Sequence, residues 1–183
     1  MKILRQLITP TKYLQITAAG GDKLWVDFGF PGIATALATG FWVWRPELIP
    51  MSGGVGMVSG VSGLIQILVG FYVATLAAIA TFPASSLDQV ANRITLKNQP
   101  LQRRRLLAYL FGHLAFLSIL LVIAMLFRPL VEAMVNRISD ADVIFWTKVA
   151  MVTAYQFVFW QMIFVTLLGL HYLTDRIHRS DPT

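Results

Sequence analysis

Few side chains in this sequence have the type and spacing that catalysis requires. Ser62, in the stretch Gly60-Val61-Ser62-Gly63, has the glycine-rich setting of a nucleophile, and His113 is a candidate base for it. If both residues lie on membrane-spanning helices, Ser62 is about 30 Å from the inner edge and His113 about 12 Å from it. The two side chains would then be about 18 Å apart, whereas a nucleophile needs its base within about 3 Å. This pair is therefore excluded.

No other pattern of catalytic or metal-binding groups stands out. The chain contains no cysteine, which excludes disulfides, thiolate metal ligands and cysteine nucleophiles. Paired carboxylates, a His-x-x-x-His pair and a glycine-rich phosphate loop after a strand are also missing. We therefore expect no catalytic residue, no metal site and no cofactor, and we predict that the protein is not an enzyme.

Three glutamines lie inside long apolar runs. If those runs are helices, Gln66 and Gln156 lie at similar depths, about 24 and 25 Å from the inner edge, and we expect a hydrogen bond between them. Gln161 lies at about 18 Å on the same helix as Gln156. These side chains either hold helices together or form a polar strip along a water-filled path.

Two titratable side chains also lie within predicted spans. His113 has Tyr109 one helical turn before it, which favours a polar pair that packs helices, with proton sensing as the alternative. Asp27 lies near the start of its run, so we expect it to cap the helix or to pair with a cytoplasmic arginine or lysine, such as those of the Arg103–Arg105 triplet.

Composition predicts the elements that carry these residues. Of 183 residues, 56% are hydrophobic and 13% are charged, against about 25% charged in a soluble domain. A helix needs about 20 apolar residues to cross a hydrocarbon core. We predict an all-α integral membrane protein, a four-transmembrane-helix bundle that is a single domain over residues 1–183, with spans at 24–44, 53–82, 106–127 and 143–173.

Local signals refine the ends of these elements. Pro31 allows the regular helix of the first span to begin near Phe30. Ser139-Asp140-Ala141-Asp142 predicts a turn with a helix cap before the last span. In the connection 83–105 we expect a short helix that begins at Ser85 or Ser86 and has one apolar face, formed by Leu87, Val90, Ala91 and Ile94.

The lysines and arginines predict the orientation. With the segments 1–23, 83–105 and 174–183 in the cytoplasm, eleven of the 15 cations lie inside and four outside, as the positive-inside rule requires. The inner set consists of Lys2, Arg5, Lys12, Lys23, Arg93, Lys97, Arg103, Arg104, Arg105, Arg176 and Arg179, and the outer set of Arg45, Arg128, Arg137 and Lys148. Both termini are therefore predicted to be cytoplasmic.

The second span carries a stripe of small residues, Gly56, Gly60, Gly63, Gly70, Ala74 and Ala77. In lipid, helices associate through close backbone contact, so this stripe predicts a packing surface. It packs within one protomer, or it forms a subunit interface or lines a pore.

The predicted cytoplasmic face carries a basic collar. Seven of its cations are candidates for docking a partner: Arg93, Lys97, Arg103, Arg104, Arg105, Arg176 and Arg179. Such a collar attracts anionic lipid headgroups or an acidic cytosolic protein. No binding motif or aromatic interleaving supports direct contact with nucleic acid.

Two stretches, Gly70-Phe71-Tyr72-Val73-Ala74 and Leu173-Thr174-Asp175-Arg176-Ile177, occur in this four-span architecture. Together with the predicted cytoplasmic termini, they resemble small membrane proteins of bacterial defence islands, in particular the membrane subunit of the Kiwa anti-phage system. The resemblance implies a homo-oligomeric sensor that holds a cytosolic effector.

We therefore expect a multi-pass protein of the bacterial inner membrane that oligomerises, and that senses the state of the membrane or anchors a cytosolic partner. The alternative is an oligomeric pore that depolarises the membrane, with Gln66, Gln156 and the small-residue stripe as its wall.

Overall fold

The computed structural model of the protein describes residues 9–18, 22–45, 57–81, 85–96 and 99–177. Within these residues, four helical segments are long and apolar enough to cross a membrane, which confirms the predicted all-α membrane fold. The segments are Trp25–Trp44, Gly60–Thr81, Arg103–Val135 and Ala141–Thr174.

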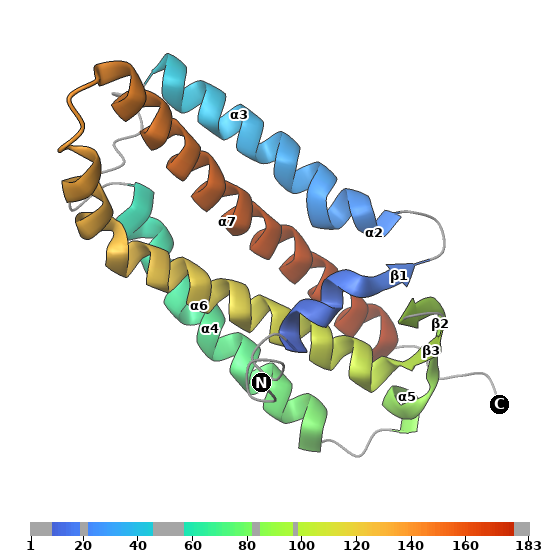
Figure 1. Ribbon diagram of the computed structural model, residues 1–183. Coiled ribbons are helices and arrows are strands. Elements are labelled where there is room, and N and C mark those ends of the chain that lie inside the picture. Colours follow the sequence, from blue (N-terminus) through green and yellow to red (C-terminus); the bar gives the residue numbers. More distant parts are fainter. Residues whose placement is uncertain (1–8, 19–21, 46–56, 82–84, 97–98, 178–183) are drawn as a thin grey trace.

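The long helices run up and down in an open row. They are α3 (Phe30–Trp44), α4 (Met57–Thr81), α6 (Arg103–Val135) and α7 (Ala141–Ile177). Helix α3 packs on α7, α7 packs on α6, and α6 packs on α4, so α6 and α7 form the centre (Figure 1). The central helices measure about 50 and 55 Å, longer than a hydrocarbon core of about 30 Å, so both extend beyond it.

The first span has an irregular start. A short α2 (Asp22–Leu24) leads into η2 (Trp25–Gly29), a π-helical turn, and regular α-helix begins at Phe30, as predicted. Pro31 lies at the beginning of α3, where its missing N–H is tolerated. A π-helical turn within a span is frequently a functional position.

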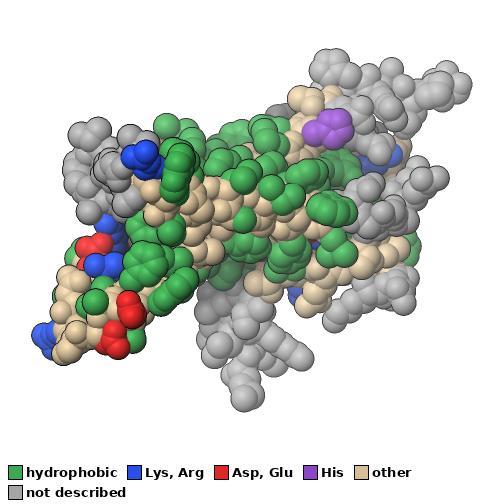
Figure 2. Space-filling model, turned by 90° about the horizontal axis from the view of Figure 1, so that it is seen from above, with side chains coloured by type: hydrophobic (Ala, Val, Ile, Leu, Met, Phe, Trp, Pro, Cys, Tyr) green, Lys and Arg blue, Asp and Glu red, His purple; other side chains and the backbone are tan. Residues whose placement is uncertain are grey.

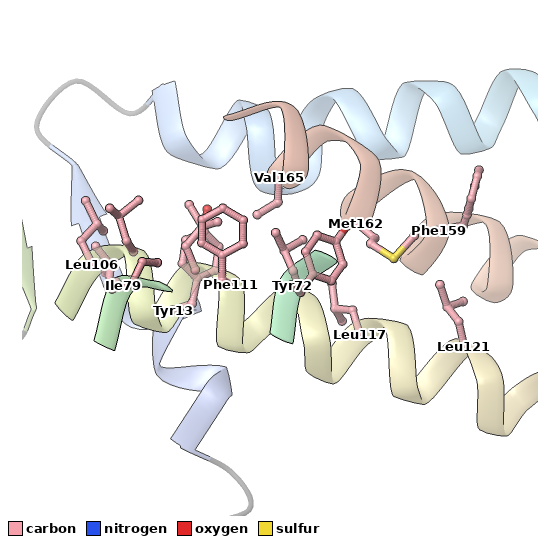
Figure 3. Close-up of a cluster of buried hydrophobic side chains, with 14 of the residues drawn as sticks. Tyr13, Tyr72, Ile79, Leu106, Phe111, Leu117, Leu121, Phe159, Met162 and Val165 are labelled. Atoms are coloured by element: carbon pink, nitrogen blue, oxygen red, sulfur yellow. The ribbon is translucent and has the colours of Figure 1, made fainter. Parts of the chain in front are cut away.

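The core lies mainly between α4, α6 and α7 (Figure 3). Tyr72 of α4, Phe111 of α6 and Met162 of α7 are fully buried there, and the Tyr72 hydroxyl lies 2.5 Å from that of Thr166. Gly169 allows close packing of α7 on α6, because a Cβ at this position would lie 2.8 Å from Leu110.

A small sheet closes one end of the bundle. It has the order β1 (Ile16–Ala18), β2 (Val90–Leu96) and β3 (Gln99–Gln102), with both pairs antiparallel. The predicted helix in the connection is wrong beyond α5 (Ser85–Asp88), because β2 occupies the rest of its apolar face. β-branched residues such as Ile94 favour a strand once partners on both sides satisfy its backbone.

Two predicted boundaries shift. The third helix begins at Arg103 instead of Leu106 and continues through Pro129 to Val135. The last helix begins at Ala141, and the Asp140 carboxylate accepts a 2.9 Å hydrogen bond from the Asp142 N–H, which confirms the predicted cap.

The N-terminal segment is part of the packed structure. A 3₁₀ turn, η1 (Thr9–Gln15), lies against α6, and β1 then pairs with β2 of the connection. Helix α6 begins and α7 ends beside this sheet (Figure 1). The described residues of the three segments predicted to share one side of the membrane therefore lie at one end of the bundle, which we call the sheet end. Its cytoplasmic location stays a prediction.

Hydrophobic side chains cover much of the outer surface, and charged side chains gather toward the ends of the molecule (Figure 2). Leu37, Ile67 and Leu126 are 70%, 72% and 75% exposed, one on each of α3, α4 and α6. Such extensive exposure of large apolar side chains is typical of a surface that faces lipid.

Candidate functional site

A buried ion pair lies at the start of the first span. Asp27 is completely buried, and its carboxylate forms a salt bridge with the Lys23 ammonium one helical turn earlier. The Tyr13 hydroxyl of η1 donates a 2.9 Å hydrogen bond to the same carboxylate, and Lys23 Nζ lies 4.3 Å from the centroid of the Tyr13 ring. Asp27 thus has a cationic partner from the predicted cytoplasmic set, as expected, but that partner is Lys23 and not the Arg103–Arg105 triplet.

The backbone beside this pair is satisfied from another span. In a regular α-helix the Asp27 carbonyl would accept a hydrogen bond from residue 31, but Pro31 has no N–H. Gln161 of α7 donates its side-chain N–H to this carbonyl at 3.1 Å. Gln161 thus holds two helices together, which was one of the two predicted roles for the glutamines.

His113 lies next to the ion pair. Its ring stacks on Tyr13 at 5.1 Å between centroids, and the residue is 2% exposed. Neither ring nitrogen has a hydrogen-bond partner within the described part of the chain. The predicted polar pair with Tyr109 is replaced by the stack on Tyr13. We call Tyr13, Lys23, Asp27 and His113 the buried polar cluster.

The cluster lies well inside the central helices. His113 is ten residues after Arg103, about 15 Å along α6, and Gln161 is thirteen residues before Thr174, about 20 Å along α7. Ionisable side chains buried against membrane-spanning helices are expensive and are by default candidates for function. Burial, followed by the charge of Asp27 and the hydrogen bond to it, raises the pKa of Tyr13. Its hydroxyl therefore stays a donor at neutral pH.

Arg104 has a structural role instead. Its guanidinium holds the Asp88 carboxylate at 2.8 and 3.3 Å and donates to the Ile79 carbonyl near the end of α4 at 2.9 Å. This residue ties α4 and α5 to α6. Arg105 is exposed and Arg103 is half-buried. Lys97 and Arg179 lie outside the described residues, and the side chains of Arg93 and Arg176 are not described.

The predicted hydrogen bond between Gln66 and Gln156 is absent. Gln66 is exposed on α4, whereas Gln156 is 2% exposed, and its Oε1 has no partner among the described residues. Gln66 and Gln156 therefore do not form one polar strip within the protomer.

The small-residue stripe points away from the rest of the protomer. A Cβ added at Gly60, Gly63 or Gly70 would meet nothing within 4 Å. Ala74 and Ala77 are exposed as well, and Gly56 lies outside the described residues. The packed side of α4 is instead the opposite one, with Val61, Ile65, Tyr72 and Ile79. Within the described part of the chain, therefore, nothing packs closely against Gly60, Gly63 or Gly70.

Sequence reasoning missed Tyr13 and Lys23, although one signal was present. Lys23 and Asp27 are four residues apart, the spacing at which opposite charges meet on a helix. No group of three potential metal ligands occurs among the described residues. The cluster is thus an ion pair that joins the N-terminal segment to the spans.

Comparison with protein families, curated proteins and solved structures finds no match for this chain.

Proposed function

We propose that this chain is a non-catalytic subunit of a homo-oligomer in the bacterial inner membrane, and that it couples the state of the bilayer to a protein partner. The observation that carries this proposal is the outward face of α4. Gly60, Gly63 and Gly70 leave most of this face without bulk, although Ile67 lies between them and is 72% exposed. Gln66 is exposed close to the same face.

The chemistry of lipid supports a second copy of the chain as the occupant of this face. A glutamine amide in contact with acyl chains lacks hydrogen bonds, which is costly. A neighbouring α4 would offer both a matching amide and a backbone close enough for dense packing. A symmetric interface of this kind is self-complementary, so one face of one helix suffices for assembly.

The sheet end supports the coupling role. The N-terminal segment is held to the first span by Tyr13 and Asp27, and it pairs with the connection through β1 and β2. A change in helix packing caused by the bilayer would therefore move the sheet as well. The exposed cation Arg105 at the same end would contact an acidic partner.

The absence of native cysteine makes a direct test of assembly simple. Gly70→Cys should form an oxidised dimer in mild detergent and in membranes, whereas Leu126→Cys, on the exposed face of α6, should not. Adding Gln66→Leu to Gly70→Cys should reduce crosslinking. Equal crosslinking at both positions, or a strictly monomeric mass in detergent, would remove the oligomer.

The partner is tested separately. Pulldown from native membranes should recover a cytosolic protein with the natural chain and less of it with Arg105→Glu. In line with the resemblance to Kiwa-type membrane subunits, we propose a role in anti-phage defence. Loss of phage protection on deletion of this chain would support that role, and unchanged protection would refute it.

The second candidate is a pore lined by α4 in the oligomer, favoured by the exposed amide of Gln66. Purified protein in liposomes should then conduct ions. Flux that survives both Gln66→Leu and Gly60→Leu would rule out this wall.

A further inference from the structure

A cavity of about 380 Å³ lies at the end of the bundle opposite the sheet, between α3, α6 and α7. Its middle is apolar and includes Ala124 and Met125 of α6 and Met151 and Val152 of α7. Trp42 contributes an aromatic wall from α3. Its volume is within the range of sites that hold a small molecule or part of a lipid.

Charged side chains line one part of this cavity. Arg128 and Glu132 form an ion pair at 2.8 Å, and Glu132 is 47% exposed. Lys148 lines the cavity from α7 and is also exposed. Because Arg128 and Glu132 balance each other, the lining carries one positive charge in excess.

Two polar groups of the lining are buried and unsatisfied. The Tyr155 hydroxyl and Gln156 Oε1 have no hydrogen-bond partner among the described residues, and Gln156 is 2% exposed. Buried polar groups in native proteins are almost always hydrogen-bonded. Both groups lie about two helical turns further along α7 than Lys148, on the side of the apolar middle.

We propose that this cavity binds a glycerophospholipid of the surrounding bilayer. The phosphodiester carries a single negative charge, which matches the single excess cation, and it lies between Lys148 and Arg128. The glycerol esters lie next to the phosphate on the hydrocarbon side, where the Tyr155 hydroxyl donates to an ester carbonyl. An acyl chain then covers Met125 and Val152.

This order of groups distinguishes a phospholipid from simpler ligands. Inorganic phosphate or glycerol phosphate would satisfy the cations but leave the apolar middle empty. A diacylglycerol would fill the apolar middle but provide no charge for Lys148. The inference does not depend on the proposed function, because the cavity and the outward face of α4 are formed by different helices.

The test uses the full chain in detergent after removal of bound lipid, with binding followed by native mass spectrometry. Phosphatidylglycerol should bind at least tenfold more tightly than diacylglycerol with the same acyl chains, and glycerol 3-phosphate should not bind. Lys148→Met and Tyr155→Phe should each weaken phosphatidylglycerol binding severalfold. The control, Arg137→Met, removes an exposed cation just after α6 that is not part of the lining, and it should leave binding unchanged.

Each other outcome overturns the proposal. Equal binding of diacylglycerol would remove the role of the cations, and equal binding of glycerol 3-phosphate would remove the lipid chains. If Lys148→Met and Arg137→Met weaken phosphatidylglycerol binding equally, the binding depends on the general surface charge and not on the cavity. Because Lys148 is exposed, its variant should fold even if Tyr155→Phe does not.

Discussion

The ion pair between Lys23 and Asp27 should make these two residues strongly and unequally sensitive to substitution. Removing one partner of a buried pair costs about 3–5 kcal/mol, because the other charge stays buried without compensation. In Asp27→Asn the orphaned Lys23 side chain is still 13% exposed and can reach water in part, so we expect the lower value, about 3 kcal/mol. In Lys23→Met the orphaned carboxylate is 0% exposed and keeps only the Tyr13 hydroxyl, so we expect about 5 kcal/mol.

The free energy of unfolding can be measured by titrating the detergent-solubilised protein with dodecyl sulfate while following helix content. The double variant Lys23→Met with Asp27→Asn should be less destabilised than Lys23→Met alone, because it leaves no charge in the cluster. Glu132→Gln is the matched control, since Arg128 and Glu132 have the same four-residue spacing but are 25% and 47% exposed, and it should cost about 0.3–0.5 kcal/mol. If Asp27→Asn costs no more than this control, the ion pair does not hold the N-terminal segment in place.

Three further predictions concern the same core. Tyr13→Phe should lower the free energy of unfolding by about 1.5–3 kcal/mol, because it removes the hydrogen bond to Asp27. The difference in tyrosinate absorbance between the natural chain and this variant isolates the ionisation of Tyr13, and it should show no titration near pH 10, because the pKa of Tyr13 is raised. Gly169→Val should destabilise the monomer by about 1–3 kcal/mol by separating α7 from α6, whereas Gly70→Val should leave monomer stability unchanged; equal losses would contradict the packing. His113→Phe should be neutral or stabilising in the same assay, because no described partner is lost; a loss above about 1 kcal/mol would reveal one.

The spans were predictable because their signals are local. Each span contains an uncharged run long enough to cross lipid, and Pro31 predicts where regular helix begins without knowledge of the rest of the fold. The cap at Asp140 is equally local, since its carboxylate binds a backbone N–H two residues later.

The sheet and the buried polar cluster were not predictable because they depend on distant partners. Val90 and Ile94 fit one face of a helix as well as a strand, and only strand pairing decides between them. Val90 pairs with Gln102 of β3, and Ile94 pairs with Ala18 of β1, which lies far earlier in the sequence. Tyr13 reaches Asp27 across a turn whose path the sequence does not specify.

Helix α4 illustrates a third limit. Its sequence contains two faces that could pack, the small residues around Gly63 and the large ones around Tyr72. In lipid both are plausible, because association follows shape and hydrogen bonding rather than hydrophobicity. The large face is buried because Phe111 and Thr166 complement the Tyr72 ring and hydroxyl, and this complementarity is visible only in three dimensions.

The two ion pairs with helical spacing show how burial assigns different roles to the same motif. Lys23 and Asp27 lie beneath η1 and against Gln161, so their mutual attraction is little screened and fixes the N-terminal segment to the first span. Arg128 and Glu132 have equivalent spacing, but water reaches both side chains and Glu132 is 47% exposed, so their pairing contributes less to stability. This pair can therefore exchange its contacts for a ligand at lower cost to the fold, which is the property that a lipid site next to Lys148 requires.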